Sequence, residues 1–141
     1  MQRFLYALLG LLGFASCGCS ALDMYGTPTV DFTIKGKVTD AEGNPIKDIA
    51  VSLETDSGTV MQSTTTAADG TFTTTKTGTD NWLFYDSVLI FTDTDGEANG
   101  GDFATYEVKT DNLPKTKVKE GDGAWYQGEY EFTADVKLTK K

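Results

Sequence analysis

The stretch VDFTIKGKVT, residues 30–39, alternates strictly between apolar and polar side chains. Its apolar members are Val30, Phe32, Ile34 and Val38, and a glycine keeps the same register between the last two. A period of two is typical of a β-strand that buries one face and exposes the other. This stretch therefore predicts a half-buried β-strand.

Further strand patterns follow downstream. Ile49, Val51 and Leu53 alternate, and the segments VMQSTTT, TFTTTKT, FATYEVKT and YEFTADVKL continue the pattern between turns rich in Gly, Asp and Asn. Residues 88–91, VLIF, lack a polar partner in alternation, which predicts a central strand buried on both faces. The polar run at residues 111–123 is interpreted as a connection.

About seven short strands at near-regular spacing, with no helical period beyond the N-terminal segment, predict an all-β protein, an antiparallel β-sandwich. The chain has 141 residues and is 39% hydrophobic, which suffices for one domain with a core and leaves no room for a second. The predicted core consists of Phe32, Ile34, Val38, Val51, Leu53, Phe72, Val88, Ile90, Phe132 and Val136.

The first sixteen residues have the pattern of a secretory signal peptide. Arg3 supplies a positive start, and an uncharged apolar run of signal-peptide length follows. The run ends in FASC, which resembles the lipobox of bacterial lipoproteins, with Phe14 where leucine is usual. The resemblance implies cleavage before Cys17 and acylation of that residue. The expected organisation is a signal peptide at 1–16, a tether at 17–29 and the β-sandwich at 30–141.

Cys19 is the less favoured acylation site because the residues before it lack the apolar position of the pattern. Other roles for the two cysteines remain open but fit less well. A disulfide across one intervening residue would be strained, a two-thiolate metal site lacks further ligands, and redox pairs normally have two residues between their thiols.

The charge balance limits the partners. Asp and Glu number 21 against 12 Lys and Arg, a formal net charge of −9, and the acidic residues are spread along the chain. Such a surface repels nucleic acid and anionic lipid headgroups, so neither is an expected partner, whereas cations or a basic protein remain possible. The chain contains no histidine, the commonest general base and zinc ligand. It also lacks nucleophile-elbow and phosphate-loop motifs, so no catalytic residue is expected and the protein is predicted not to be an enzyme.

The span from Gly36 to Thr75 resembles carboxypeptidase regulatory-like and transthyretin-like domains. The matching positions are Gly36, Val38, Asp40, Gly43, Pro45, Val51, Asp69, Gly70 and Phe72. Residues of these types make turns and fill cores, so the resemblance implies structural tasks for them.

Nearly the whole chain is similar to the radical SAM-associated lipoproteins of Bacteroidetes. The lipobox, YGTPTVDFTIKGKVTD, FTDTDGEANGGDF and YEFTADVKLTKK carry this similarity. It implies a lipid-anchored protein of the cell envelope at the outer membrane, with the periplasmic and outer faces both open. It also implies that a radical SAM enzyme is encoded nearby, which makes that enzyme or other envelope proteins the expected partners.

An acidic loop at residues 93–102, DTDGEANGGD, is a candidate calcium site. Oxygen-bearing side chains among glycines suit a hard cation, and the candidate ligands are Asp93, Asp95, Glu97, Asn99 and Asp102. The match to the helical calcium loop is partial, because Tyr106 stands where that loop requires a bidentate glutamate. Asp, Asn and Gly are also ordinary turn residues, and turn chemistry is the favoured interpretation. No other cofactor is expected.

Four aromatic residues could form an exposed platform for sugar or protein binding: Trp82, Tyr85, Trp125 and Tyr126. The favoured alternative is that they close the ends of the sandwich. The leading expectation for function is a membrane-anchored, non-enzymatic binding or assembly module, a partner or substrate of a radical SAM maturase. A surface adhesin or structural subunit, whose terminal strand would extend a neighbour's sheet, and a calcium- or carbohydrate-binding accessory protein are the alternatives.

Overall fold

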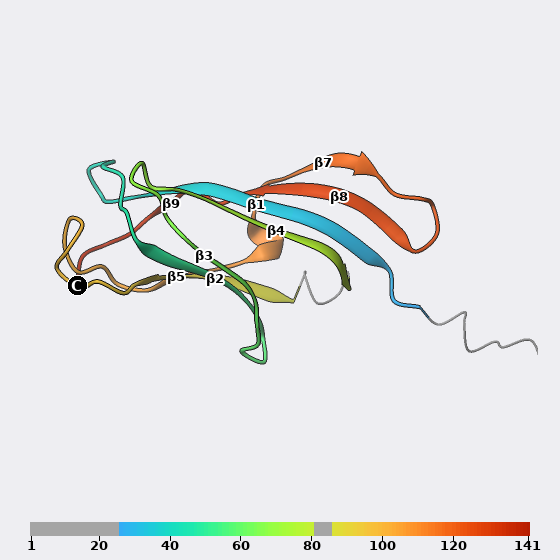
Figure 1. The fold of residues 1–141 in the computed structure, drawn as a ribbon, viewed down its shortest axis with the longest axis horizontal. Helices are drawn as coiled ribbons and strands as arrows, with labels where there is room; N and C mark the ends of the chain where they lie inside the picture. The colour runs from blue at the N-terminus through green and yellow to red at the C-terminus, as the bar shows by residue number, and fades with distance from the viewer. Residues whose placement is uncertain (1–25, 81–85) are drawn as a thin grey trace, which may run out of the picture.

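The computed structural model describes residues 26–80 and 86–141, which form two β-sheets packed face to face (Figure 1). The described residues contain nine strands and one short 3-10 helix, η2. Their bounds are β1 Thr29–Thr39, β2 Ile49–Thr55, β3 Val60–Thr65, β4 Thr71–Asp80, β5 Ser87–Asp93, β6 Tyr106–Lys109, η2 Thr110–Asn112, β7 Lys115–Glu120, β8 Tyr126–Thr133 and β9 Val136–Lys137. The predicted all-β sandwich is confirmed.

One sheet has the order β4, β1, β8, β7, with β9 also pairing with β1, and the other has the order β3, β2, β5, β6. Most neighbours are antiparallel, but β1 runs parallel to both β8 and β9. Strand β1 is thus the centre of its sheet. Its four apolar residues are at most 1% exposed, as the alternation predicted.

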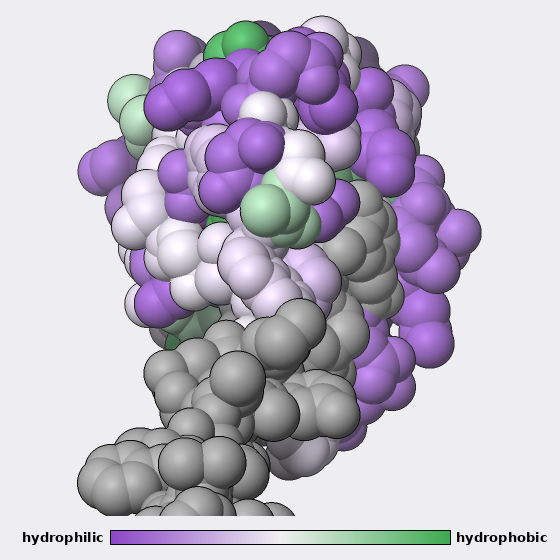
Figure 2. Space-filling model, turned by 90° about the vertical axis from the view of Figure 1, so that its right-hand side faces the viewer, coloured by the Kyte–Doolittle hydropathy of each residue, from purple (hydrophilic) through white to green (hydrophobic). Residues whose placement is uncertain are grey.

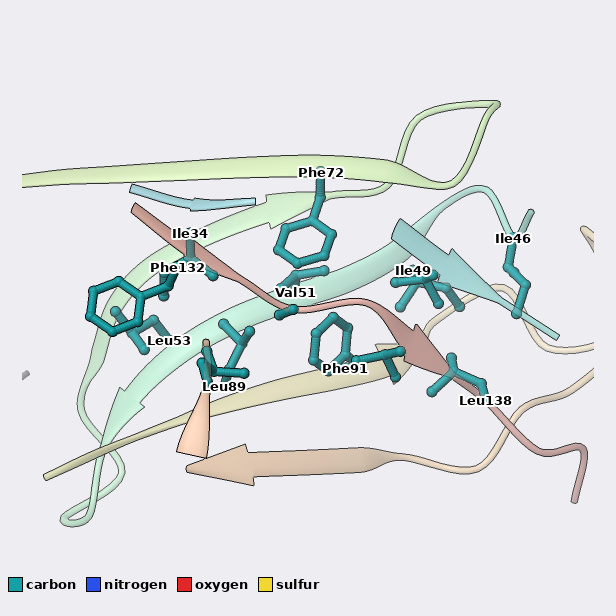
Figure 3. Packing of buried hydrophobic residues seen from close by; sticks show 14 of the residues in the cluster. Ile34, Ile46, Ile49, Val51, Leu53, Phe72, Leu89, Phe91, Phe132 and Leu138 are labelled. Carbon is teal, nitrogen blue, oxygen red and sulfur yellow. The ribbon is translucent and has the colours of Figure 1, made fainter. Parts of the chain in front are cut away.

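The core lies between the sheets, and residues that alternate along β1, β2, β5 and β8 fill it (Figure 3). Phe72 points from β4 toward Phe91 of β5, with ring centroids 5.5 Å apart at an interplanar angle of 76°. Edge-to-face contacts of this kind add to the burial of both rings. Of the ten predicted core residues, eight are buried.

Val88 and Ile90 are the two exceptions, and the prediction that β5 is buried on both faces is wrong. Leu89 and Phe91 point into the core with no exposed surface, whereas Val88 and Ile90 lie on the outer face and are half-buried. On that face they stand beside Lys109 and Glu107 of the edge strand β6. The outer face is open to solvent and only partly covered by its neighbours.

Residues 111–123 do not form a simple connection, because β7 lies within them and pairs antiparallel with β8. All six residues of β7 are exposed. An edge strand with few buried neighbours needs no apolar face, so its sequence lacks the burial signal of the other strands. A register irregularity between Lys117 and Lys119 and the lysines themselves are features that protect free edges from further pairing.

The final alternating pattern, predicted as one strand, is divided between β8 and β9. Phe132, Ala134, Val136 and Leu138 all point inward, as expected. Strand β8 is paired on both sides, with β1 and β7, whereas β9 pairs with β1 alone among the described strands. Extension of a neighbour's sheet by the terminal strand stays a prediction. The described parts of the chain include no helix with the length and apolarity that a membrane crossing requires.

Candidate functional site

The acidic loop follows β5 at the end of the sandwich that also carries the C-terminus (Figure 1). Asp93, its first residue, accepts hydrogen bonds from the backbone N–H of Asp95 at 3.1 Å and of the buried Phe103 at 2.9 Å. Burial alone would raise the pKa of Asp93, but these hydrogen bonds outweigh it and lower the pKa below the ordinary value. The carboxylate of Asp93 therefore holds both ends of the loop.

Asn99 joins this loop to a distant turn. Its side-chain amide donates to Asp95 within the loop and to Asp48, 3.1 Å away in the connection between β1 and β2. Asn99 and Asp48 both have positive φ, at 50° and 63°, which places each in a tight backbone turn. Sequence reasoning missed Asp48, because nothing in its local sequence indicates that it meets the acidic loop.

The remaining candidate ligands lie farther along the loop. Asp102 forms an ion pair with Lys141 at 2.8 Å, and its carbonyl accepts the backbone N–H of the same lysine. The hydrogen bond to Asp102 raises the pKa of Lys141. Glu97 is exposed. Among the described residues, no three His, Cys, Asp or Glu side chains converge as a metal site would require.

The loop thus places Asp93, Asp95 and Asn99 near one another and adds Asp48, while Asp102 holds the C-terminus. The contacts formed are those of turn chemistry, the favoured interpretation of the sequence. Calcium binding by the acidic loop stays a prediction.

Two of the four aromatic candidates lie within the described residues. Trp82 and Tyr85 lie outside the described residues, while Trp125 and Tyr126 lie where the turn after β7 enters β8. The hydroxyl of Tyr126 donates to Asp31 at 3.0 Å, and Asp31 in turn accepts the backbone N–H of Gly78 at 2.7 Å. Burial, followed by this hydrogen bond, raises the pKa of Tyr126. Tyr126 therefore ties β8 to β1 and β4.

Trp125 has a different environment, because 46% of its surface is exposed. Its carbonyl accepts the backbone N–H of Thr29 at 2.8 Å, which fixes the first strand beside it. A shallow hollow of about 310 Å³ lies next to this turn, lined in part by Lys117, Glu120 and Tyr126. The predicted lipidation site Cys17 and the less favoured Cys19 lie outside the described residues.

The turn after β1 explains the sequence pattern at Asp40. The Asp40 carboxylate accepts the backbone N–H groups of Glu42 at 3.0 Å and Asn44 at 2.8 Å, and the Asn44 side-chain amide at 3.0 Å. The Asn44 side-chain hydrogen bond is the main cause of the lowered pKa of Asp40. Pro45 then bridges back to Thr39. This pattern is used to close a turn.

Comparisons with known proteins agree with this architecture. The family model of the carboxypeptidase regulatory-like domain matches residues 33–84, a span that holds most of β1 and all of β2, β3 and β4. The match confirms the carboxypeptidase regulatory-like resemblance over that span. No curated protein matches the chain significantly.

Solved structures with a similar fold include two dioxygenases. The 3-chlorocatechol 1,2-dioxygenase of Rhodococcus opacus 1CP has a TM-score of 0.52 at 14% identity, over 83% of this chain and 62% of that one. The catechol 1,2 dioxygenase of Acinetobacter radioresistens has a TM-score of 0.52 at 16% identity, over 80% of this chain and 53% of that one. The chain therefore spans less than two thirds of either enzyme's length, and at such identities the likeness shows the fold alone.

Proposed function

We propose that this protein is a lipid-anchored module of the bacterial cell envelope, held at the outer membrane through Cys17, and that its β-sandwich acts by binding or assembly without catalysis. The carrying observation is the sequence FASC at the end of an apolar segment of signal-peptide length. Acyl chains on Cys17 would each bury many methylene groups in the bilayer, at about 0.8 kcal/mol per group. Such an anchor holds a folded domain durably.

A binding role is supported by the match to the carboxypeptidase regulatory-like family and by the way the polar side chains are used. Asp40, Asp93 and Tyr126 are each engaged in bonds that close turns or join strands. The chain has no histidine to serve as a general base. These features favour a scaffold that presents surfaces and loops.

Mass spectrometry of the protein purified from its native host tests the anchor. We expect a chain that begins at Cys17 and carries acyl groups, found in the membrane fraction. Cys17→Ser should abolish both the cleavage and the acyl mass, whereas the matched variant Cys19→Ser should leave them unchanged. A product with an intact leader and no acyl mass would refute the proposal.

The role of partner or substrate of a radical SAM maturase rests on the resemblance to the radical SAM-associated lipoproteins. Intact-mass measurement separates the two roles. A substrate should carry extra mass beyond the acyl groups, and that mass should disappear when the adjoining radical SAM gene is deleted. If the protein carries no mass beyond the acyl groups in either strain, the substrate role is excluded.

Calcium binding is a second candidate, favoured by the meeting of Asp48, Asp95 and Asn99. Calcium at millimolar concentration should raise the melting temperature, since a ligand that binds only the folded state stabilises it. Asp95→Asn should abolish that shift, while Asp56→Asn, a change at an exposed aspartate in another turn, should not. An unchanged melting temperature would remove this candidate.

A further inference from the structure

The described chain begins beside the β7–β8 hairpin. Strand β1 starts at Thr29, whose N–H is bonded to the carbonyl of Trp125, and a Cβ atom on Gly26 would lie 3.7 Å from the Trp125 ring. In Figure 1 the hairpin turn and the start of β1 lie at one end of the long axis, and the C-terminus and the acidic loop lie at the other. Any anchor upstream of Gly26 therefore attaches at the hairpin end.

The length of chain between the anchor and the domain limits their separation. Nine residue steps join Cys17 to Gly26. Because an extended chain spans at most about 3.3–3.6 Å per residue, these steps reach no farther than about 30 Å. If Cys17 is acylated, the hairpin end is the part of the domain that stays nearest to the bilayer.

The hairpin end exposes apolar side chains. Trp125 is 46% exposed, and Val118 on β7 is 59% exposed. The lysines of β7 are balanced by acidic neighbours, because Lys117 is paired with Glu120 and Lys119 lies opposite Glu129 of β8. Tryptophan is enriched where membranes meet water.

The opposite end carries the acidic loop together with lysines, because Lys141 is paired with Asp102 and Lys47 with Asp48. Charge alone therefore does not distinguish the two ends. Figure 2 views the molecule from the hairpin side, where strongly hydrophilic residues border paler ones. The tether length and the exposed Trp125 favour an orientation with the hairpin end toward the membrane.

We propose that in the anchored protein the turn at residues 121–125 and the exposed β7 rest on the surface of the bilayer. This inference depends on the proposed acylation of Cys17. The exposed ring of Trp125 would then lie at the interface between membrane and water, where tryptophan is favoured. The acidic loop then points away from the membrane and toward external partners.

Fluorescence quenching by brominated lipid tests the contact. The acylated protein with Trp82→Phe, which leaves Trp125 as its one tryptophan, is reconstituted into vesicles of phosphatidylethanolamine and phosphatidylglycerol. We expect Trp125 to lose about half of its emission when the acyl chains are brominated, since interfacial tryptophans lie within reach of those chains. The matched reporter combines Trp82→Phe and Trp125→Phe with Ala98→Trp in the acidic loop, and it should keep its emission.

Three results would overturn the inference while the anchor itself stands. In the first, acyl mass is confirmed on the protein and Trp125 remains unquenched. Trp125 can be shielded from iodide in native membranes and yet unquenched in pure lipid vesicles, which would assign the surface to a protein partner. Shielding that rises with the amount of protein per vesicle would assign it to a second copy. Absence of acyl mass would instead refute the proposed function.

Discussion

At the scale of the residue, short polar side chains hold the turns of this protein. Thr66, which follows β3, shows the principle most clearly because it is only 2% exposed. Its hydroxyl donates to the carbonyl of Ile46 at 2.7 Å and accepts the N–H of Ile49 at 3.0 Å. One side chain thereby satisfies two backbone groups that have no partner in a strand at that point.

Thr66→Val should destabilise the protein by about 1–3 kcal/mol, because it leaves two buried backbone groups without a partner while preserving the shape of the side chain. Urea unfolding of the purified domain measures this change. The same substitution at the exposed Thr65 serves as the control and should have little effect. Equal unfolding free energies for the two variants would show that the Thr66 hydroxyl is dispensable.

Gly36 explains why the residue that keeps the register of β1 has no side chain. The crossing from β8 to β9 passes over it, and a Cβ atom there would lie 2.0 Å from the carbonyl oxygen of Ala134. Gly36→Ala should therefore cost about 1–3 kcal/mol or more through displacement of backbone. The matched change Gly26→Ala meets only an ordinary contact with Trp125, so the two melting temperatures should differ clearly.

At the scale of the element, β5 and β7 show how position in a sheet determines what a strand sequence means. The apolar run of β5 lies in the middle of its sheet, yet only Leu89 and Phe91 face the other sheet. The lysine-rich β7 is a strand because β8 offers it a free edge. Pairing and not composition decides both cases.

Alanine substitutions on the two faces of β5 test this assignment. Leu89→Ala removes a fully buried side chain and should cost about 2–5 kcal/mol. Ile90→Ala removes a half-buried side chain from the outer face and should cost roughly 1 kcal/mol. Denaturant unfolding of both variants gives the comparison, and equal losses would restore the prediction of a strand buried on both faces.

At the scale of the whole molecule, the two ends of the long axis carry different structural features. The described N-terminal end carries the hairpin with Trp125, and the other end gathers the acidic loop and the C-terminus (Figure 1). Several turns rely on carboxylates that accept backbone N–H groups, among them Asp40, Asp69 and Asp93. The stability of the domain is therefore linked to their ionisation.

The unfolding free energy should fall in acid. The pKa of Asp69 is lowered, chiefly by the side-chain hydrogen bond from Thr71, and the pKa values of Asp40 and Asp93 are lowered as well. A carboxyl whose pKa is lower in the folded state stabilises the fold above its unfolded pKa, and this contribution is lost as the pH falls through the folded value. Melting temperatures should be steady near neutral pH and decline below about pH 4.

Asp40→Asn should lower the melting temperature at neutral pH and make the decline in acid shallower, because one of the responsible carboxylates is gone. Glu42→Gln is the matched control, because the Glu42 carboxylate lies in the same turn but accepts none of the three hydrogen bonds that Asp40 accepts. The melting temperature of this variant should decline in acid as it does in the unchanged protein. Identical profiles for Asp40→Asn and Glu42→Gln would refute the assigned role of Asp40.

The sequence by itself determined the all-β class, the inward face of β1, β2 and β8, and the turn at Asp40, because alternation and turn chemistry are local properties. Only the tertiary structure decided that β1 pairs in parallel with β8 and β9, and that Asp48 meets Asn99 across 51 positions. It also decided which face of VLIF is buried, since an apolar run without alternation fits either face. Long-range pairing leaves no local mark on the residues that it joins.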